Sequence, residues 1–231
     1  MLVASVARLR VATAGGVCQK QLAASDKISI ESTMRNVPSR IVAYAKSQPE
    51  GALFGANELL GFGARAAVDQ ALVRLVNAGD IMRVARGTYT LPVATRFGLR
   101  GPDELLLARS FARREGVTIA RHGADEAHRL GLSTQVPVKT VWLTSGRAAL
   151  LSVGSQTVAF KPAAQWLLAD PGGRAGALLR AVAWLGADEA VEQLRALGPS
   201  LSAAERETLL DARGQMPGWM AKAVSDSLSH G

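Results

Sequence analysis

The chain has 231 residues and 48% hydrophobic content, so it can bury the core of one large domain or of two modest ones. Its formal net charge of +8 comes almost entirely from residues 1–100, where Lys and Arg outnumber Asp and Glu by 13 to 6; the remaining residues hold 14 and 13. A basic first half favours duplex DNA as a partner, whereas a near-neutral second half favours a protein partner or self-association. Cys18 is the only cysteine, which excludes an internal disulfide and a thiolate metal cage.

Neither export nor membrane insertion is predicted. The apolar run at residues 1–7 is too short for a signal peptide and precedes Arg8 and Arg10 instead of following them. No uncharged apolar run approaches the roughly 18 residues of a transmembrane helix. We therefore expect a cytoplasmic protein without a membrane partner. Residues 1–34, rich in Ser, Ala and Gly, are expected to be a disordered lead, unless Met34 is the true start of the protein.

Residues 35–92 predict a winged helix-turn-helix. The expected elements are three helices, a short strand and a hairpin, over Pro38–Lys46, Ala52–Phe54, Glu58–Leu60, Val68–Val76 and Ile81–Leu91. In the longest helix the apolar residues recur at i, i+4, i+7 and i+8, which is one buried stripe. Gly63 breaks the chain before this helix, Gly79 stops it, and Arg86-Gly87 forms the hairpin turn.

The second helix of such a motif enters the major groove of DNA with its polar face. That face is predicted to carry Arg65, Asp69, Gln70 and Arg74, and the hairpin adds Arg83, Arg86 and Thr88. We expect Arg65 and Gln70 to contact base edges, because Arg suits guanine and Gln suits adenine. Arg74, Arg83 and Arg86 are assigned to phosphates or the minor groove. The alternative is that these cations are an ordinary solvated face.

Beyond residue 92 we expect a linker over 93–102, a helix and β-hairpin domain over 93–165, and three or four short helices over 166–231. The elements of the middle region are predicted at Asp103–Glu115, Val117–Ala120, Ala124–Leu130, Lys139–Thr144, Ala149–Val153 and Thr157–Lys161. Most of the four tryptophans, Trp142, Trp166, Trp184 and Trp219, are expected in the core. The predicted fold class is therefore α+β.

No catalytic, cofactor or metal site is predicted. Residues 61–66 match the G-x-G-x-x-A dinucleotide fingerprint in letters, but a helix precedes them where that motif requires a strand. His122, Asp125 and His128 are spaced three apart, which spreads them around a helix instead of converging on one ion. The paired carboxylates, such as Asp103-Glu104, fall at expected helix starts. We therefore expect a non-enzymatic protein with no cofactor, no metal and no small-molecule substrate.

Two stretches of the chain carry a family resemblance: the first is Ala64–Leu75 with Ile81–Tyr89, and the second and more specific is Leu130–Pro137, which leads into Thr140–Gly146. They resemble AbiEi-type antitoxins of the abortive-infection, type IV toxin-antitoxin systems. The resemblance covers about residues 35–228. It implies a DNA-binding antitoxin that represses its own promoter and is paired with a nucleotidyltransferase-like toxin. Two alternatives stay open: an orphan winged-helix regulator without a toxin, and a module whose winged helix contacts protein.

Overall fold

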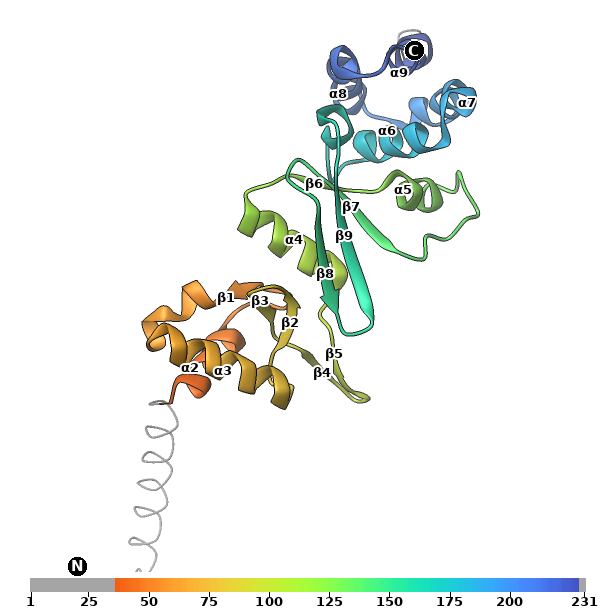
Figure 1. Ribbon diagram of the computed structural model, residues 1–231. Helices are drawn as coiled ribbons and strands as arrows, with labels where there is room; N and C mark the ends of the chain where they lie inside the picture. The colour runs from red at the N-terminus through yellow and green to blue at the C-terminus, as the bar shows by residue number, and fades with distance from the viewer. Residues whose placement is uncertain (1–35, 229–231) are drawn as a thin grey trace, which may run out of the picture.

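The computed structural model describes residues 36–228, which form a mixed α+β fold. The predicted lead at 1–34 lies outside the described residues. The described chain runs from a small helix and sheet region, through a four-stranded sheet, to a group of helices at the opposite end of the molecule (Figure 1). Within the described chain, no helix has the length and apolar character needed to cross a membrane.

The first region is built around one apolar core between two helices and a small sheet. Its elements are α2 (Val37–Ser47), β1 (Phe54–Gly55), η1 (Ala56–Phe62), α3 (Arg65–Ala78), β2 (Met82–Ala85) and β3 (Thr88–Thr90). The sheet has the order β1-β3-β2 and is antiparallel throughout. The buried stripe of α3 packs against α2, η1 and the sheet, as its spacing predicts, through Val68, Ala71, Leu72 and Leu75.

The structure refines two predictions in this region, those for the short second helix and for Gly63. The short second helix is confirmed in place, but it is a 3-10 helix, and the Glu58 Oε1 atom accepts the Gly55 N–H at its start at 3.1 Å. Gly63 ends it in extended conformation, and a Cβ there would approach Val37 Cγ2 to 2.9 Å, so close packing on α2 explains this glycine. Gly79 ends α3 with φ +79°, the left-handed conformation predicted for a helix stop.

The predicted linker at 93–102 is wrong. Residues 93–100 form an antiparallel hairpin of β4 (Val93–Thr95) and β5 (Gly98–Arg100), with Gly98 at φ +110° in its turn. Gly101, expected to mark flexibility, is packed so closely on Val153 that a side chain would not fit. The connection between the two regions is therefore held in place.

The middle region holds a four-stranded sheet with the order β6-β7-β9-β8. Its elements are α4 (Glu104–Glu115), β6 (Ile119–Arg121), α5 (Gly123–Arg129), β7 (Thr140–Thr144), β8 (Ala149–Val153) and β9 (Gln156–Pro162), close to their predicted positions. The β-hairpin predicted for this region is formed by β8 and β9, and β9 lies between β8 and β7 and runs parallel to β7. Val158 and Phe160 of β9 are almost completely buried, which explains its inner position.

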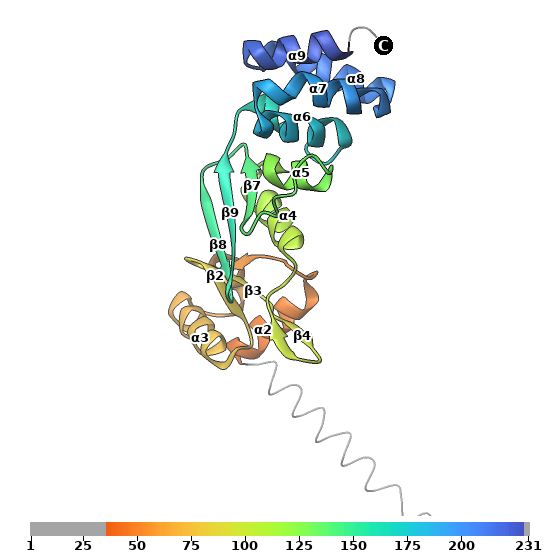
Figure 2. The ribbon, with the colours of Figure 1, turned by 90° about the vertical axis from the view of Figure 1, so that its right-hand side faces the viewer.

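The first and middle regions share one apolar core. Leu53 and Val84 from the first region are buried together with Leu107, Leu151 and other residues of α4 and the large sheet. Strand β2 lies against β8 in both ribbon views (Figures 1 and 2). The packing fixes the orientation of the first sheet relative to the second.

Four helices and three short 3-10 turns at the end of the chain form a core of their own. They are η2 (Gln165–Leu168), α6 (Arg174–Leu185), α7 (Ala187–Leu197), η3 (Gly198–Ser200), α8 (Ala203–Ala212), η4 (Arg213–Gln215) and α9 (Gly218–Leu228), which confirms the predicted helical region. Helix α5 packs along α6 and joins this group to the sheet. Of the tryptophans, Trp142 is buried and Trp166 half-buried, whereas Trp184 and Trp219 are each 38% exposed.

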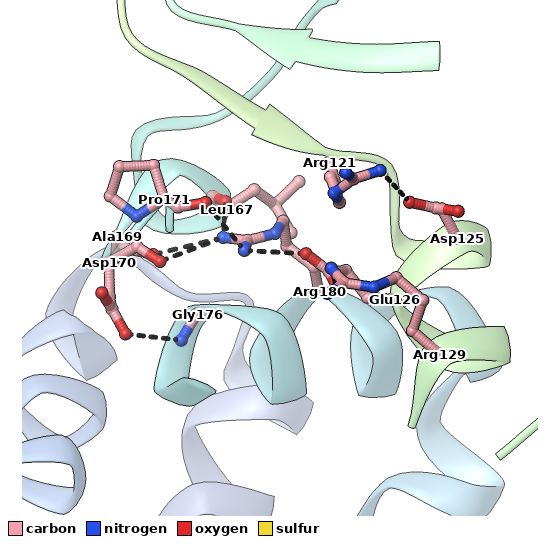
Figure 3. Close-up of polar contacts among 10 residues, drawn as sticks. All are labelled: Arg121, Asp125, Glu126, Arg129, Leu167, Ala169, Asp170, Pro171, Gly176 and Arg180. Atoms are coloured by element: carbon pink, nitrogen blue, oxygen red, sulfur yellow. Dashed lines mark hydrogen bonds and ion pairs between the residues drawn. The ribbon is translucent and has the colours of Figure 1, made fainter. Parts of the chain in front are cut away.

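A buried arginine ties the helical group to α5 and to the loop after η2. Arg180 is 1% exposed and donates to the carbonyl oxygens of Leu167, Ala169, Asp170 and Pro171 and to Glu126 Oε1, the last at 3.3 Å (Figure 3). Glu126 is itself 3% exposed, and its second oxygen accepts from Arg129 at 3.2 Å. Burial lowers the pKa of Arg180 and the Glu126 carboxylate opposes this shift, so the guanidinium stays charged.

Candidate nucleic-acid interface

The exposed face of α3 is mostly uncharged at its centre and cationic at one flank. Ala66, Gln70, Val73 and Asn77 are all exposed and recur at i, i+4, i+7 and i+11, so they lie along one line opposite the buried stripe. The apolar side chain of Val73, at the middle of the helix, is 59% exposed. Arg74 is exposed beside this line and has no polar partner within residues 36–228. Asn77 and Val73 were not predicted as interface residues, because the prediction considered only the charged residues and Gln on this face of the helix.

Arg65 is held by side chains of its own region. It is the first residue of α3, and its Nε donates to both carboxylate oxygens of Asp69, at 2.9 and 3.1 Å. Its Nη1 donates to Asn57 Oδ1 at 2.8 Å, and the side chain is 59% exposed. A base contact by Arg65 therefore requires exchange of these bonds, whereas Gln70 has no such partner within the described part of the chain.

The β2–β3 hairpin carries the other predicted cations. Arg86 is exposed at the turn, next to Gly87 with φ +69°, and Arg83 is exposed on β2 with its Nε bonded to the Ala85 carbonyl at 3.3 Å. Thr88 is half-buried on β3. The opposite face of β2 is covered by β8, where Val84 is 2% exposed. Only one face and the tip of this hairpin are open to a partner.

A second hairpin, β4–β5, projects from the same region and was missed in the sequence because residues 93–102 were interpreted as a linker. Phe97 at its turn is 85% exposed, and the Arg96 guanidinium lies 4.6 Å from the centre of the Phe97 ring. Leu99 is 64% exposed, and Arg100 pairs with Glu50 at 3.6 Å. Helix α3 and this hairpin both lie at the end of the molecule remote from α6–α9 (Figures 1 and 2).

The residues weighed for metal or catalytic roles have structural partners. His122 caps α5 with its Nδ1 accepting the Ala124 N–H at 3.3 Å, Asp125 pairs with Arg121 at 2.9 Å, and His128 Nδ1 lies 3.4 Å from the Ser133 carbonyl. No group of three His, Cys, Asp or Glu in the described range 36–228 is arranged to hold a metal ion. Burial and the nearby Lys161 lower the pKa of His122, so its cap keeps a neutral ring.

Comparisons with known proteins give a family without an assigned activity. No curated protein matches the chain. The crystal structure of the RV2827C protein from Mycobacterium tuberculosis is similar over 84% of this chain and 76% of that chain, with 18% identity and a TM-score of 0.47. A family model matches residues 40–197, and the chain therefore belongs to the family of unknown function DUF6088.

Proposed function

We propose that residues 36–92 are a winged helix-turn-helix that binds duplex DNA, and that the protein regulates transcription from its own promoter. The observation that carries the proposal is the exposed face of α3, together with the exposed Arg86 at the turn of the β2–β3 hairpin. An α-helix fits the major groove of B-DNA, and a cationic hairpin tip fits the adjoining phosphates or minor groove. The net positive charge of residues 1–100 supports a polyanionic partner.

The side chains of α3 suit base recognition at its centre. Gln70 offers the bidentate amide that pairs with adenine, and Asn77 offers the same group two turns later on the same line. The exposed Val73 between them is apolar, as is the methyl group of thymine. Arg74 at the flank would neutralise a phosphate. Arg65 would contact a base only after its ion pair with Asp69 breaks.

The β4–β5 hairpin extends the proposed interface. An exposed aromatic ring beside a guanidinium suits the minor groove, where apolar wedges and arginines act together. Arg96 and Phe97 occupy the turn of this hairpin, where the exposed ring and the guanidinium lie 4.6 Å apart. In this proposal the α3 face lies in the major groove, with the two hairpins on the flanking DNA.

A binding assay with matched variants tests the proposal. Fluorescence anisotropy would follow binding to a fragment from upstream of the gene and to a scrambled fragment, each over a salt series. Replacing Arg86 or Arg96 with Gln should weaken binding to both fragments equally and reduce the salt slope by about one unit. Gln70→Ala should lower the preference for the promoter fragment by roughly 1–3 kcal/mol. Arg195→Gln, an exposed change on α7, is the control.

Affinity that does not fall with salt would refute DNA binding, because neutralised phosphates always release counterions. Equal behaviour of all variants and the control would refute the assigned surface. Each variant should melt at the temperature of the parent, since the substituted side chains are exposed.

We also propose the antitoxin role, which is supported by the sequence resemblance at residues 64–75, 81–89 and 130–146. The test is growth of cells that express the neighbouring gene, with and without this protein. Rescue supports a toxin and antitoxin pair. A neighbouring gene that does not encode a nucleotidyltransferase-like protein, or is harmless alone, would leave the orphan regulator as the function.

A further inference from the structure

Four arginines from four different elements line one cavity in the second half of the molecule. The cavity has a volume of about 640 Å³ and lies where α4, β6, α5 and α6 meet; its arginines are Arg109, Arg121, Arg129 and Arg174. Figure 3 shows Arg121 bonded to Asp125, and Arg129 beside Glu126, next to the buried Arg180 network. This volume is in the range of small-ligand sites, roughly 300–1,000 Å³.

Two of the four arginines of the cavity already have a carboxylate partner: Arg121 pairs with Asp125 at 2.9 Å, and Arg129 pairs with Glu126 at 3.2 Å. Two acids line the cavity, and Glu126 is already bound to Arg180 and Arg129. Glu205 accepts the Ser202 N–H at 2.8 Å at the start of α8, and these hydrogen bonds lower its pKa. Arg109 and Arg174 have no carboxylate within ion-pair distance among the described residues; Arg174 bonds only to the backbone and hydroxyl of Ser200.

The first turn of α6 also lines the cavity. Gly172, Gly173 and Arg174 line it, and Gly173 caps this 12-residue helix without a side chain. The Gly176 N–H is taken by Asp170 Oδ2 at 3.2 Å, while the N–H groups of Arg174 and Ala175 have no acceptor within the described chain. A free N–H at a helix start favours an anion; of these two, that of Arg174 belongs to a residue that lines the cavity, whereas Ala175 is fully buried.

The rest of the wall is apolar. Leu105, Ile119, Leu130 and Ala177 line it together with Trp142. Trp142 is 5% exposed, and its indole N–H is buried with no hydrogen-bond partner in residues 36–228. This N–H is not accessible, so Trp142 contributes its apolar ring, and not a donor, to the wall of the cavity. An inorganic anion would use the arginines and leave the apolar wall uncovered.

We propose that this cavity binds a phosphorylated small molecule of nucleotide size. Its phosphates lie against Arg109, Arg174 and the start of α6, and its uncharged part lies on the apolar wall. None of the residues assigned to DNA lines the cavity, so this site stands independently of the proposed DNA interface.

Calorimetry with ADP, inorganic pyrophosphate and adenosine as probes tests the site. We expect ADP to bind more tightly than pyrophosphate or adenosine, because only ADP has both phosphates for the arginines and an uncharged part for the apolar wall. Arg109→Gln and Arg174→Gln should each weaken ADP binding by at least about tenfold, the effect of losing a charge-assisted hydrogen bond. Arg147→Gln, an exposed change between β7 and β8 that does not line the cavity, should bind as the parent does.

Three results would overturn the proposal: no binding of ADP at millimolar concentration, equal affinity for pyrophosphate and ADP, or equal losses in Arg147→Gln and the cavity variants. Circular dichroism melting of each variant keeps a folding defect apart from a binding defect. Anisotropy with promoter DNA, measured on the same variants without ADP, should match the parent. Failure of the cavity and failure of the DNA interface are thereby distinguishable.

Discussion

Arg180 and Arg129 contact the same carboxylate, and their different burial predicts very different costs of removal. Arg180 Nη2 lies 3.3 Å from Glu126 Oε1, and Arg129 Nη1 lies 3.2 Å from Glu126 Oε2. The Arg180 side chain is 1% exposed, whereas the Arg129 side chain is 56% exposed. Replacing each arginine with Met keeps most of its aliphatic stem and removes the guanidinium.

The expected magnitude follows from what each substitution leaves behind. Arg180→Met removes the donor for four backbone carbonyls and leaves Glu126, 3% exposed, with one partner at its rim. Breaking a buried ion pair from one side costs about 3–5 kcal/mol. Arg129→Met removes a partner that is 56% exposed and leaves Glu126 paired with Arg180, so its cost is nearer the value of an exposed pair, about 0–1 kcal/mol. For a chain of this size 1 kcal/mol corresponds to roughly 2–4 °C in melting temperature.

Thermal and urea unfolding, followed by circular dichroism, measure the difference. Arg180→Met should lower the melting temperature by about 6–20 °C and Arg129→Met by less than about 4 °C. The double variant Glu126→Gln with Arg180→Met should lose less than the sum of the two single losses, because the pair is coupled. Equal losses from the two arginine variants, or additive losses in the double variant, would refute the assignment of stability to this buried pair.

Three further outcomes are expected from local geometry. Gly176→Ala would place a methyl group inside a backbone carbonyl of the preceding loop and should melt well below the parent, whereas Gly214→Ala meets nothing and should melt like it. Burial and Lys161 hold the pKa of His122 below its unfolded value of about 6.5, so unfolding free energy should fall as urea titrations move from pH 7 to pH 5; His122→Asn, which can still cap, should flatten that fall. Asp103→Ala removes the oxygen that accepts two N–H groups at the start of α4 and should cost about 1 kcal/mol in urea unfolding, with no loss taken as refutation.

Local patterns predicted the first region well because its elements follow one another closely in the chain. The apolar spacing of α3 and the stop at Gly79 depend only on neighbouring residues, and both are confirmed. The hairpin at 93–100 was missed because Gly98 supplies both the flexibility of a linker and the positive φ of a tight turn. The three residues of β4 before this turn do not distinguish a linker from a hairpin.

Features that join distant residues could not be predicted. The parallel pairing of β7 with β9 depends on which strand is most deeply buried, and a sequence does not show strand neighbours. Arg180 and Glu126 are 54 positions apart. One signal was present, since Arg180 interrupts the apolar run of Leu178, Leu179 and Val182, where a charge on the inner face of a helix calls for an acid elsewhere.

The packing of β2 against β8 limits where this protein can be truncated. A fragment ending at residue 92 would uncover Val84 and Leu53, each less than 10% exposed in the whole chain, and would lose their packing on Leu151. Such a truncated piece should aggregate or melt early, because a strand with one naked apolar face invites association. Residues 36–92 therefore cannot be transplanted onto another protein without part of the large sheet.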